Sequence, residues 1–281
     1  MEVIPYQDVF QVNNLEIEEY INNGINRVKL SHYTSFETME IILKNKSLKL
    51  NRIDLVNDRK ESEYLEKPET YARVFVGCFT HREEESIPQW YMYTPMYDGV
   101  KIEFMLDKKL STDLSGIIDM NRKLLVEYDD RSLAEFDLKS HLFQSYAFKN
   151  DTKWKISLTC TDIGYSNDLM SRNPIHRNFD DEVYVDISPL AKIKEKAWDF
   201  EEETRIIGLF QTTANNLVLD IPNCMYLPLD LSRLTIRIIL NPWSDSIFKS
   251  KVESFCKEIL KDYRYEIVNS SLHNTLAERK W

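Results

Sequence analysis

The sequence between residues 198 and 207 reads Trp198-Asp199-Phe200-Glu201-Glu202-Glu203-Thr204-Arg205-Ile206-Ile207. It contains an aromatic start, clustered carboxylates, one arginine and an apolar end. In an extended chain the side chains alternate between two faces, so Glu201, Glu203 and Arg205 share one face and Glu202 points the other way. Three consecutive glutamates disfavour a strand. The alternative is a solvent-exposed helix face, on which Glu201 and Arg205 form an ordinary i, i+4 pair.

The composition predicts a globular protein with a sizeable core. The chain has 281 residues, of which 43% are hydrophobic and 12% aromatic. No run approaches the roughly 18 apolar residues that cross a bilayer, and the first residues lack a basic and then apolar signal segment. We therefore expect a cytoplasmic protein without membrane contact. The net charge of -10 opposes a broad basic footprint on nucleic acid but leaves room for a local contact.

Cysteine, histidine and glycine patterns exclude several classes of site. The four cysteines (78, 160, 224 and 256) are widely spaced in largely apolar surroundings, which predicts reduced, buried thiols. No histidine cluster occurs, and the loop at 57–61 offers only Asp58 and Glu61 as hard-metal ligands, so we predict no metal and disfavour a metal-dependent nuclease. Neither G-x-G-x-x-G nor G-x-x-x-x-G-K-[ST] occurs, which disfavours Rossmann and P-loop nucleotide binding.

Hydrophobic periodicity predicts a mixed α+β protein without regular βαβ alternation, folded as a single domain over residues 1–281. A capping box from Thr34 to Glu37 and a cap at Ser86 predict the starts of two helices. Apolar spacing through Leu133 and Phe136 predicts helix in the middle of the chain. The expected parts are an N-terminal helical arm (1–26), a β core (27–128 and 180–270) and a helical insertion (129–179).

Short motifs follow one another in order from the first strand to the stretch quoted above. They are His32-Tyr33-Thr34, Val56-Asn57-Asp58 with Glu61, Cys78-Phe79-Thr80, Trp90-x-x-Tyr93, Gly99-Val100-x-Ile102-Glu103-Phe104 and Trp198-x-x-Glu201-x-Glu203-x-Arg205. In this order and spacing they resemble a bacterial family, domain of unknown function 2971, over roughly residues 28 to 270. That family has no settled chemistry to carry over.

The front end is also similar, at the level of the fold, to the ADP-ribosyltransferase toxins that modify DNA. In those enzymes a strand ends in His-x-Thr and the next helix ends in an Ile-Leu-x-Asn or Gly stop. The resemblance implies a split, mostly antiparallel β core with flanking helices that takes NAD as its substrate. It also implies an early His, a central Tyr and a late Glu, which here are His32, then Tyr91 or Tyr93, then Glu201 or Glu203.

Such a site breaks the nicotinamide glycosidic bond through an oxocarbenium-like ribose, which a nearby carboxylate stabilises. We assign this role to Glu203 and activation of the acceptor to Glu201, because adjacent carboxylates raise the pKa of one of the pair. The residues alone do not decide which of the two is catalytic. Arg205 is expected to restrain their repulsion or to bind a phosphate.

The remaining predicted contacts to NAD come from the front half of the chain. His32 is expected to donate to the adenosine ribose, and Tyr33, Tyr91 or Tyr93 to stack on nicotinamide. The further predicted contacts are Thr34, Asn57, Asp58 and Trp90. Each has a structural alternative: a satisfied strand-end histidine, a packed aromatic ring, or a turn held by Asn57 and Asp58.

We therefore predict an NAD-consuming ADP-ribosyltransferase-like effector of the bacterial toxin or phage-defence type, or an NAD glycohydrolase, with an unspecified acceptor. The alternative is a non-catalytic module that binds a protein partner, such as an antitoxin, through its acidic surface and the helix around Trp90. A pocket that gathers His32, Tyr93, Glu203 and Arg205 favours the enzyme. The same residues scattered, or buried in fixed salt bridges, favour the module.

Overall fold

The computed structural model describes most of the predicted core. The described residues are 27–56, 58, 61, 74–95, 97–110, 114, 116–128, 131–138, 144–149, 152–167, 175–179, 182–186, 191–212, 222–273 and 275. The predicted arm at 1–26 and Asn57 lie outside these residues. No helix in these ranges is both long and apolar enough to cross a membrane.

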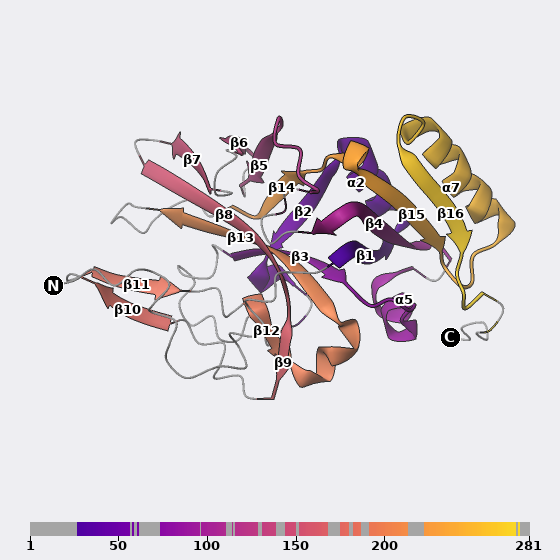
Figure 1. Cartoon of the computed structure of the whole chain (residues 1–281), viewed down its shortest axis with the longest axis horizontal. Coiled ribbons are helices and arrows are strands. Elements are labelled where there is room, and N and C mark those ends of the chain that lie inside the picture. The colour runs from indigo at the N-terminus through magenta and orange to yellow at the C-terminus, as the bar shows by residue number, and fades with distance from the viewer. Residues whose placement is uncertain are drawn as a thin grey trace.

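Strands dominate the described chain (Figure 1). They are β1 (Arg27–Ser35), β2 (Ser47–Arg52), β3 (Val74–Thr80), β4 (Gly99–Leu110), β5 (Lys123–Glu127), β6 (Leu133–Asp137), β7 (Gln144–Lys149), β8 (Thr152–Asp162), β9 (Gly164–Ser166), β10 (Ile175–Phe179), β11 (Glu182–Asp186), β12 (Ile193–Glu195), β13 (Glu203–Thr212), β14 (Cys224–Pro228), β15 (Leu234–Leu240) and β16 (Arg264–Asn269). The α-helices are α2 (Phe36–Asn45), α5 (Ile87–Tyr93) and α7 (Ser246–Ile259). Short 3-10 helices are η2 (Ile53–Leu55), η4 (Lys196–Glu201) and η5 (Leu231–Arg233).

Twelve of these strands form one sheet. Its main path is β16-β15-β4-β1-β3-β2-β14-β5-β6, and a branch leaves β3 through β13, β8 and β7. Neighbouring strands in this sheet run antiparallel except β15 and β16, which are parallel. Two small sheets, β10-β11 and β9-β12, stand apart from it. The predicted mixed α+β fold with a mostly antiparallel core is confirmed.

The large sheet divides beside β3. Strand β1 pairs with β3 only at Ser31 and Thr80, whereas β13 pairs with the full length of β3. Beyond Ser31 the two strands part, and the His32 side chain takes the place of a backbone ladder bond, with its Nδ1 2.9 Å from the Cys78 carbonyl oxygen. The predicted split in the core therefore lies between β1 and β3.

Helices cover the two faces of the divided sheet. Because side chains alternate along β1, Leu30 faces the main apolar core, where α2 and α7 pack, while Ser31 and Tyr33 face α5. The Trp90 ring of α5 meets the Tyr33 ring edge-on, 4.8 Å between centroids. Figure 1 shows α2 and α7 together on one side and α5 on the other.

Local sequence signals explain where these helices begin. Ser35 Oγ accepts a hydrogen bond from Thr38 N at the start of α2, and Ser86 Oγ accepts one from Gln89 N at the start of α5. Each caps a backbone N–H that has no partner within the first turn. Pro88 sits in the first turn of α5, where a missing N–H costs nothing. Both helices form where they were predicted, but the cap of α2 is Ser35 and not Thr34, with which the predicted capping box began.

The predicted helical insertion at 129–179 is wrong. This segment contains β6, β7, β8, β9 and β10. Ile156, Leu158 and Cys160 are buried at every second position, which is the period of a strand. Strand β8 pairs with β13 on one side and β7 on the other, and this pairing overrides the spacing of apolar residues that predicted a helix in this segment.

Candidate functional site

The candidate site forms where η4 ends and β13 begins. Glu202 adopts a left-handed backbone conformation with a φ of 43°, and the strand starts one residue later at Glu203. Glu203 and Arg205 therefore share one face of β13, as predicted, but Glu201 lies on the turn before it. The crowding of three like charges that disfavours an extended chain explains the difference.

Burial decides between the two sequence interpretations of this stretch. Glu203 is 3% exposed and Arg205 is 1% exposed, so the solvent-exposed helix face is excluded. Glu202 points the opposite way, with its side chain 41% exposed and its Oε1 2.6 Å from Arg82 Nη1. The predicted division between inward Glu203 and Arg205 and outward Glu202 is confirmed.

Five buried charged residues, Glu61, Lys194, Glu201, Glu203 and Arg205, form what we term the β13 charge cluster. Arg205 Nε lies 2.7 Å from Glu203 Oε1, and Arg205 Nη2 lies 2.6 Å from Glu61 Oε1. Lys194 Nζ lies 2.6 Å from Glu201 Oε2, 3.4 Å from Glu203 Oε2 and 3.7 Å from Glu61 Oε1. Three carboxylates thus share two cations in the protein interior.

The surroundings push the two central carboxylates in opposite directions. Although burial alone would raise the pKa of Glu203, the guanidinium of Arg205 and the ammonium of Lys194 lower it to about 2. Burial raises the pKa of Glu201, and the attraction of Lys194 offsets this only partly while Glu203 adds to it. Glu203 is therefore a fixed anion, and Glu201 is the carboxylate that takes up a proton more readily.

Strand β3 and helix α5 hold Glu201 in place. Tyr93 donates its hydroxyl hydrogen to Glu201 Oε1 in a short hydrogen bond. The Glu201 carbonyl oxygen accepts hydrogen bonds from Thr80 Oγ1 at 2.6 Å and from Gln89 Nε2 at 2.9 Å. Glu201 is thereby fixed both at its backbone and at its carboxylate.

His32 adopts a defined tautomer at the split between β1 and β3. A carbonyl oxygen can only accept a hydrogen bond, so Nδ1 carries the hydrogen that it donates to Cys78. Burial lowers the pKa of His32 despite this backbone bond, which keeps the ring neutral near pH 7. Nε2 is then an acceptor, so the predicted donation to a ribose is reversed: His32 can accept a hydrogen bond from a hydroxyl.

The other predicted aromatic contacts are dispersed. Tyr33 is buried and accepts a hydrogen bond from Ser86 N at its hydroxyl oxygen, 2.8 Å away. Trp90 is 1% exposed and donates from Nε1 to Glu85 Oε2. The Tyr91 ring lies 5.0 Å from the Trp243 ring. Tyr93 is the predicted aromatic residue that reaches the β13 charge cluster.

Two further predicted contacts, Thr34 and Asp58, are buried side chains. The Asp58 carbonyl oxygen accepts a hydrogen bond from Glu61 N at 3.0 Å, in a turn that carries Glu61 to Arg205. Glu61 is therefore the residue of the Val56-Asn57-Asp58 and Glu61 motif that contacts Arg205. It was not among the predicted contacts to NAD.

Sequence reasoning missed three residues that complete the site. Lys194 balances the carboxylates, Gln89 supports Glu201, and the Tyr165 hydroxyl oxygen accepts a hydrogen bond from Glu203 N at 2.8 Å. Lys194 is one of three alternating lysines, at 192, 194 and 196, and the sequence does not distinguish it from the other two. Nothing in the sequence singles out Tyr165.

The sheet face that carries the cluster continues as a polar row. Glu203 pairs with Thr80, Thr80 with Ser31, and Ser31 with Glu103, in register across four strands. Glu103 is buried and its Oε1 lies 2.9 Å from Lys101 Nζ. The face beneath α5 is therefore polar beside the split, opposite the apolar core.

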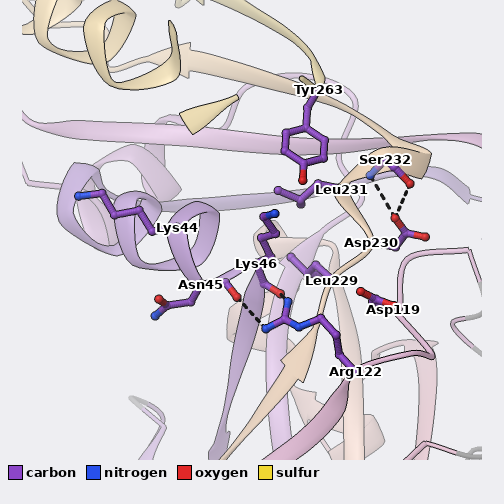
Figure 2. A pocket seen from close by; sticks show the side chains of 10 residues that line it. All are labelled: Lys44, Asn45, Lys46, Asp119, Arg122, Leu229, Asp230, Leu231, Ser232 and Tyr263. Carbon is purple, nitrogen blue, oxygen red and sulfur yellow. Dashed lines mark hydrogen bonds between the residues drawn. The ribbon is translucent and has the colours of Figure 1, made fainter. Parts of the chain in front are cut away.

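A separate hollow of about 360 Å³ lies at the C-terminal end of α2 (Figure 2). Arg122 crosses it and donates to the carbonyl oxygens of Lys46 at 2.8 Å and Asn45 at 3.1 Å. Asp230 accepts a hydrogen bond from the Ser232 hydroxyl at its rim. None of the predicted site residues lines this hollow, so it is distinct from the β13 charge cluster.

The cysteines match the predicted free, buried thiols at three of the four positions. Cys160, Cys224 and Cys256 are free and buried, while Cys78 is free and half-buried. Within the described ranges, no group of three or more His, Cys, Asp or Glu side chains is arranged to hold a metal ion.

Comparison with known proteins adds a family and one distant structure. No curated protein matches the chain. The structure of Thermus sp. 2.9 DarT in complex with NAD+ covers 86% of this chain and 94% of its own, with 9% sequence identity and a TM-score of 0.33. The family described as protein of unknown function (DUF2971) matches residues 89–206, which include Tyr93, Glu201, Glu203 and Arg205. The resemblance to DUF2971 that the ordered motifs predicted is confirmed over these residues.

Proposed function

We propose that this protein is an NAD-consuming, ADP-ribosyltransferase-like enzyme whose site is the β13 charge cluster. The observation that supports it is the pair of carboxylates, Glu201 and Glu203, that share Lys194 and have pKa values shifted in opposite directions. Enzymes that cleave glycosidic bonds need one permanent anion and one carboxylate that exchanges a proton. The cluster supplies both carboxylates, which lie 2.6 Å (Glu201) and 3.4 Å (Glu203) from the same ammonium group of Lys194.

Glu203 takes the role of the permanent anion. When the bond between ribose C1′ and the nicotinamide nitrogen breaks, the electron pair leaves with nicotinamide and positive charge develops on the ribose. A buried carboxylate that is already ionised stabilises this charge without rearranging. Arg205 and Lys194 keep Glu203 ionised and oriented.

Glu201 takes the role of the base. The acceptor attacks C1′ through its oxygen or nitrogen, and its proton passes to the Glu201 carboxylate. A carboxylate with a raised pKa accepts a proton more readily than an ordinary one. With a macromolecule as acceptor the product is ADP-ribosylated, and with water it is free ADP-ribose. The hydroxyl of Tyr93 orients Glu201 for this step.

The biological role that fits this chemistry is an effector of the bacterial toxin or phage-defence type. The acceptor stays unspecified, and because the net charge of -10 opposes a broad contact with nucleic acid, a nucleic-acid acceptor would be contacted only locally. An acidic protein of this kind is also compatible with control by a protein partner such as an antitoxin.

Transfer of labelled ADP-ribose from NAD tests the proposal. Pure protein is incubated with labelled NAD and with DNA, RNA or total bacterial protein as acceptor. Label should appear on one acceptor class, or as free ADP-ribose, with wild type and with the exposed control Glu202→Gln, and be lost with Glu203→Gln. The proposal fails if wild type transfers and hydrolyses nothing while Glu203→Gln keeps the cellular phenotype of wild type.

Burial favours a second candidate, a non-catalytic module that binds a protein partner. Glu203 and Arg205 are almost fully enclosed in ion pairs, the arrangement expected of a structural cluster. The predicted criteria thus divide: Tyr93, Glu203 and Arg205 come together around Glu201, but in enclosed ion pairs, whereas His32, which the criterion also named, bonds to the Cys78 carbonyl oxygen. For a module, Glu203→Gln changes the phenotype only as far as it changes the amount of folded protein, which a thermal melt measures.

A further inference from the structure

Lys194 holds the position from which the β13 charge cluster would bind a cation. Its Nζ lies within 3.7 Å of oxygens from Glu61, Glu201 and Glu203, and 4.6 Å from the centroid of the Trp198 ring. Carboxylates on one side and an aromatic face on the other are the surroundings that recognise an organic cation. A planar cation suits them best, because its ring stacks on the indole while its charge meets the carboxylates.

An independent observation shows that the cluster has unused capacity for a ligand. Glu61 is 3% exposed, and its Oε2 has no hydrogen-bond partner among the residues that the structure describes. A buried carboxylate oxygen without a donor is costly. Its sister oxygen, Oε1, already contacts Arg205 and faces Lys194.

The element that carries Lys194 is small and stands apart from the large sheet. Strand β12 has three residues and, among the described strands, pairs with β9 alone, in a two-stranded parallel sheet. In Figure 1 these two strands lie beside the start of β13, to its left. The side chain of Lys194 therefore reaches the cluster from the small sheet, whereas Glu203 and Arg205 belong to β13 of the large sheet.

We propose that Lys194 is an intramolecular occupant of a subsite for a planar organic cation, and that a ligand of this class displaces its ammonium group from between Glu201, Glu203 and the Trp198 ring. This inference deepens the proposed function and rests on it for the identity of the ligand. The presence of the Lys194 ammonium group in this subsite explains why the carboxylates are enclosed when no ligand is bound. The cluster keeps its charge balance when one cation replaces another, but not when Lys194 leaves alone.

Binding of 1-methylnicotinamide tests the subsite, with uncharged nicotinamide as the matched probe. Neither carries a ribose, so binding is independent of NAD turnover. By calorimetry, Lys194→Met should bind 1-methylnicotinamide at least about tenfold tighter than wild type, as expected for removing a buried competing charge. Its affinity for nicotinamide should be unchanged, and Lys194→Arg and the exposed control Lys196→Met should resemble wild type. Adding Glu203→Gln to Lys194→Met should cancel the gain.

A measurement on the unaltered protein covers the case in which Lys194→Met does not fold. Wild type is acetylated to low conversion with acetic anhydride, with and without 1-methylnicotinamide, and each lysine is quantified by mass spectrometry. Displacement should raise the acetylation of Lys194 severalfold and leave that of exposed Lys196 unchanged. Nicotinamide should have no effect.

The outcomes separate this inference from the proposed function. The inference is overturned if Lys194→Met binds 1-methylnicotinamide no tighter than wild type, if both probes gain equally, or if the probe leaves Lys194 acetylation unchanged. If the cation-specific gain is observed while NAD is never consumed, the subsite stands and the enzyme proposal falls. If NAD is consumed without that gain, the enzyme stands and the subsite falls.

Discussion

Arg205 Nε lies 2.7 Å from Glu203 Oε1, and both side chains are enclosed by the sheet and its neighbours. Two residues apart on one strand, they would be an ordinary surface pair if exposed. Because both side chains are buried, the loss of either one leaves the other as an unpaired charge in the protein interior. This pair anchors the site and determines how it responds to mutation and pH.

Breaking the pair should destabilise the protein strongly. We expect Arg205→Met to lower the free energy of unfolding by about 3–5 kcal/mol, because Glu203 and Glu61 then lose the guanidinium between them and keep only the longer contacts to Lys194. The matched control Arg233→Met removes an exposed partner of Asp230 and should cost less than about 1 kcal/mol. Urea unfolding measures both. Equal costs for the two variants would show that the buried pair is not specially stabilising.

Acid should remove the contribution of Glu203. Its pKa of about 2 in the folded protein lies below the ordinary value of 4.5, so its stabilisation is full above pH 4.5 and is lost as pH falls through about 2. The difference corresponds to about 3 kcal/mol. The stability gap between wild type and Glu203→Gln should therefore shrink between pH 5 and pH 2, which denaturant unfolding at each pH reveals. A gap independent of pH would contradict the assignment.

The Tyr93 hydroxyl should tune Glu201. Its hydrogen bond lowers the pKa of Glu201, acting against burial, so Tyr93→Phe should raise that pKa further. In the proposed enzyme the acid limb of the pH–rate profile then moves to higher pH, and the rate falls about 10-fold or more. Tyr91→Phe, on the same helix but beside Trp243, is the control. The same shift in both variants would rule out a specific role for Tyr93.

Local signals predicted part of this molecule. Helix α5 was predicted by Ser86 and Pro88, and the inward face of Glu203 and Arg205 by the two-residue period of a strand. Strand β8 was missed because the apolar residues from Leu133 onward fit a helical spacing as well as a strand, and only pairing with β13 and β7 decides. Sequence order cannot show that Glu61 meets Arg205 across 144 positions, since only the tertiary fold brings them together.

The rate of nicotinamide release from NAD tests the central claim most directly, because it reports glycosidic cleavage whatever the acceptor. Chromatography should show nicotinamide release by wild type and by Glu202→Gln at similar rates. The rate for Glu203→Gln should be lower by a factor of about 100 or more. A thermal melt confirms that the variants are folded. Equal release by folded wild type and Glu203→Gln would contradict the assignment of the β13 charge cluster as the site.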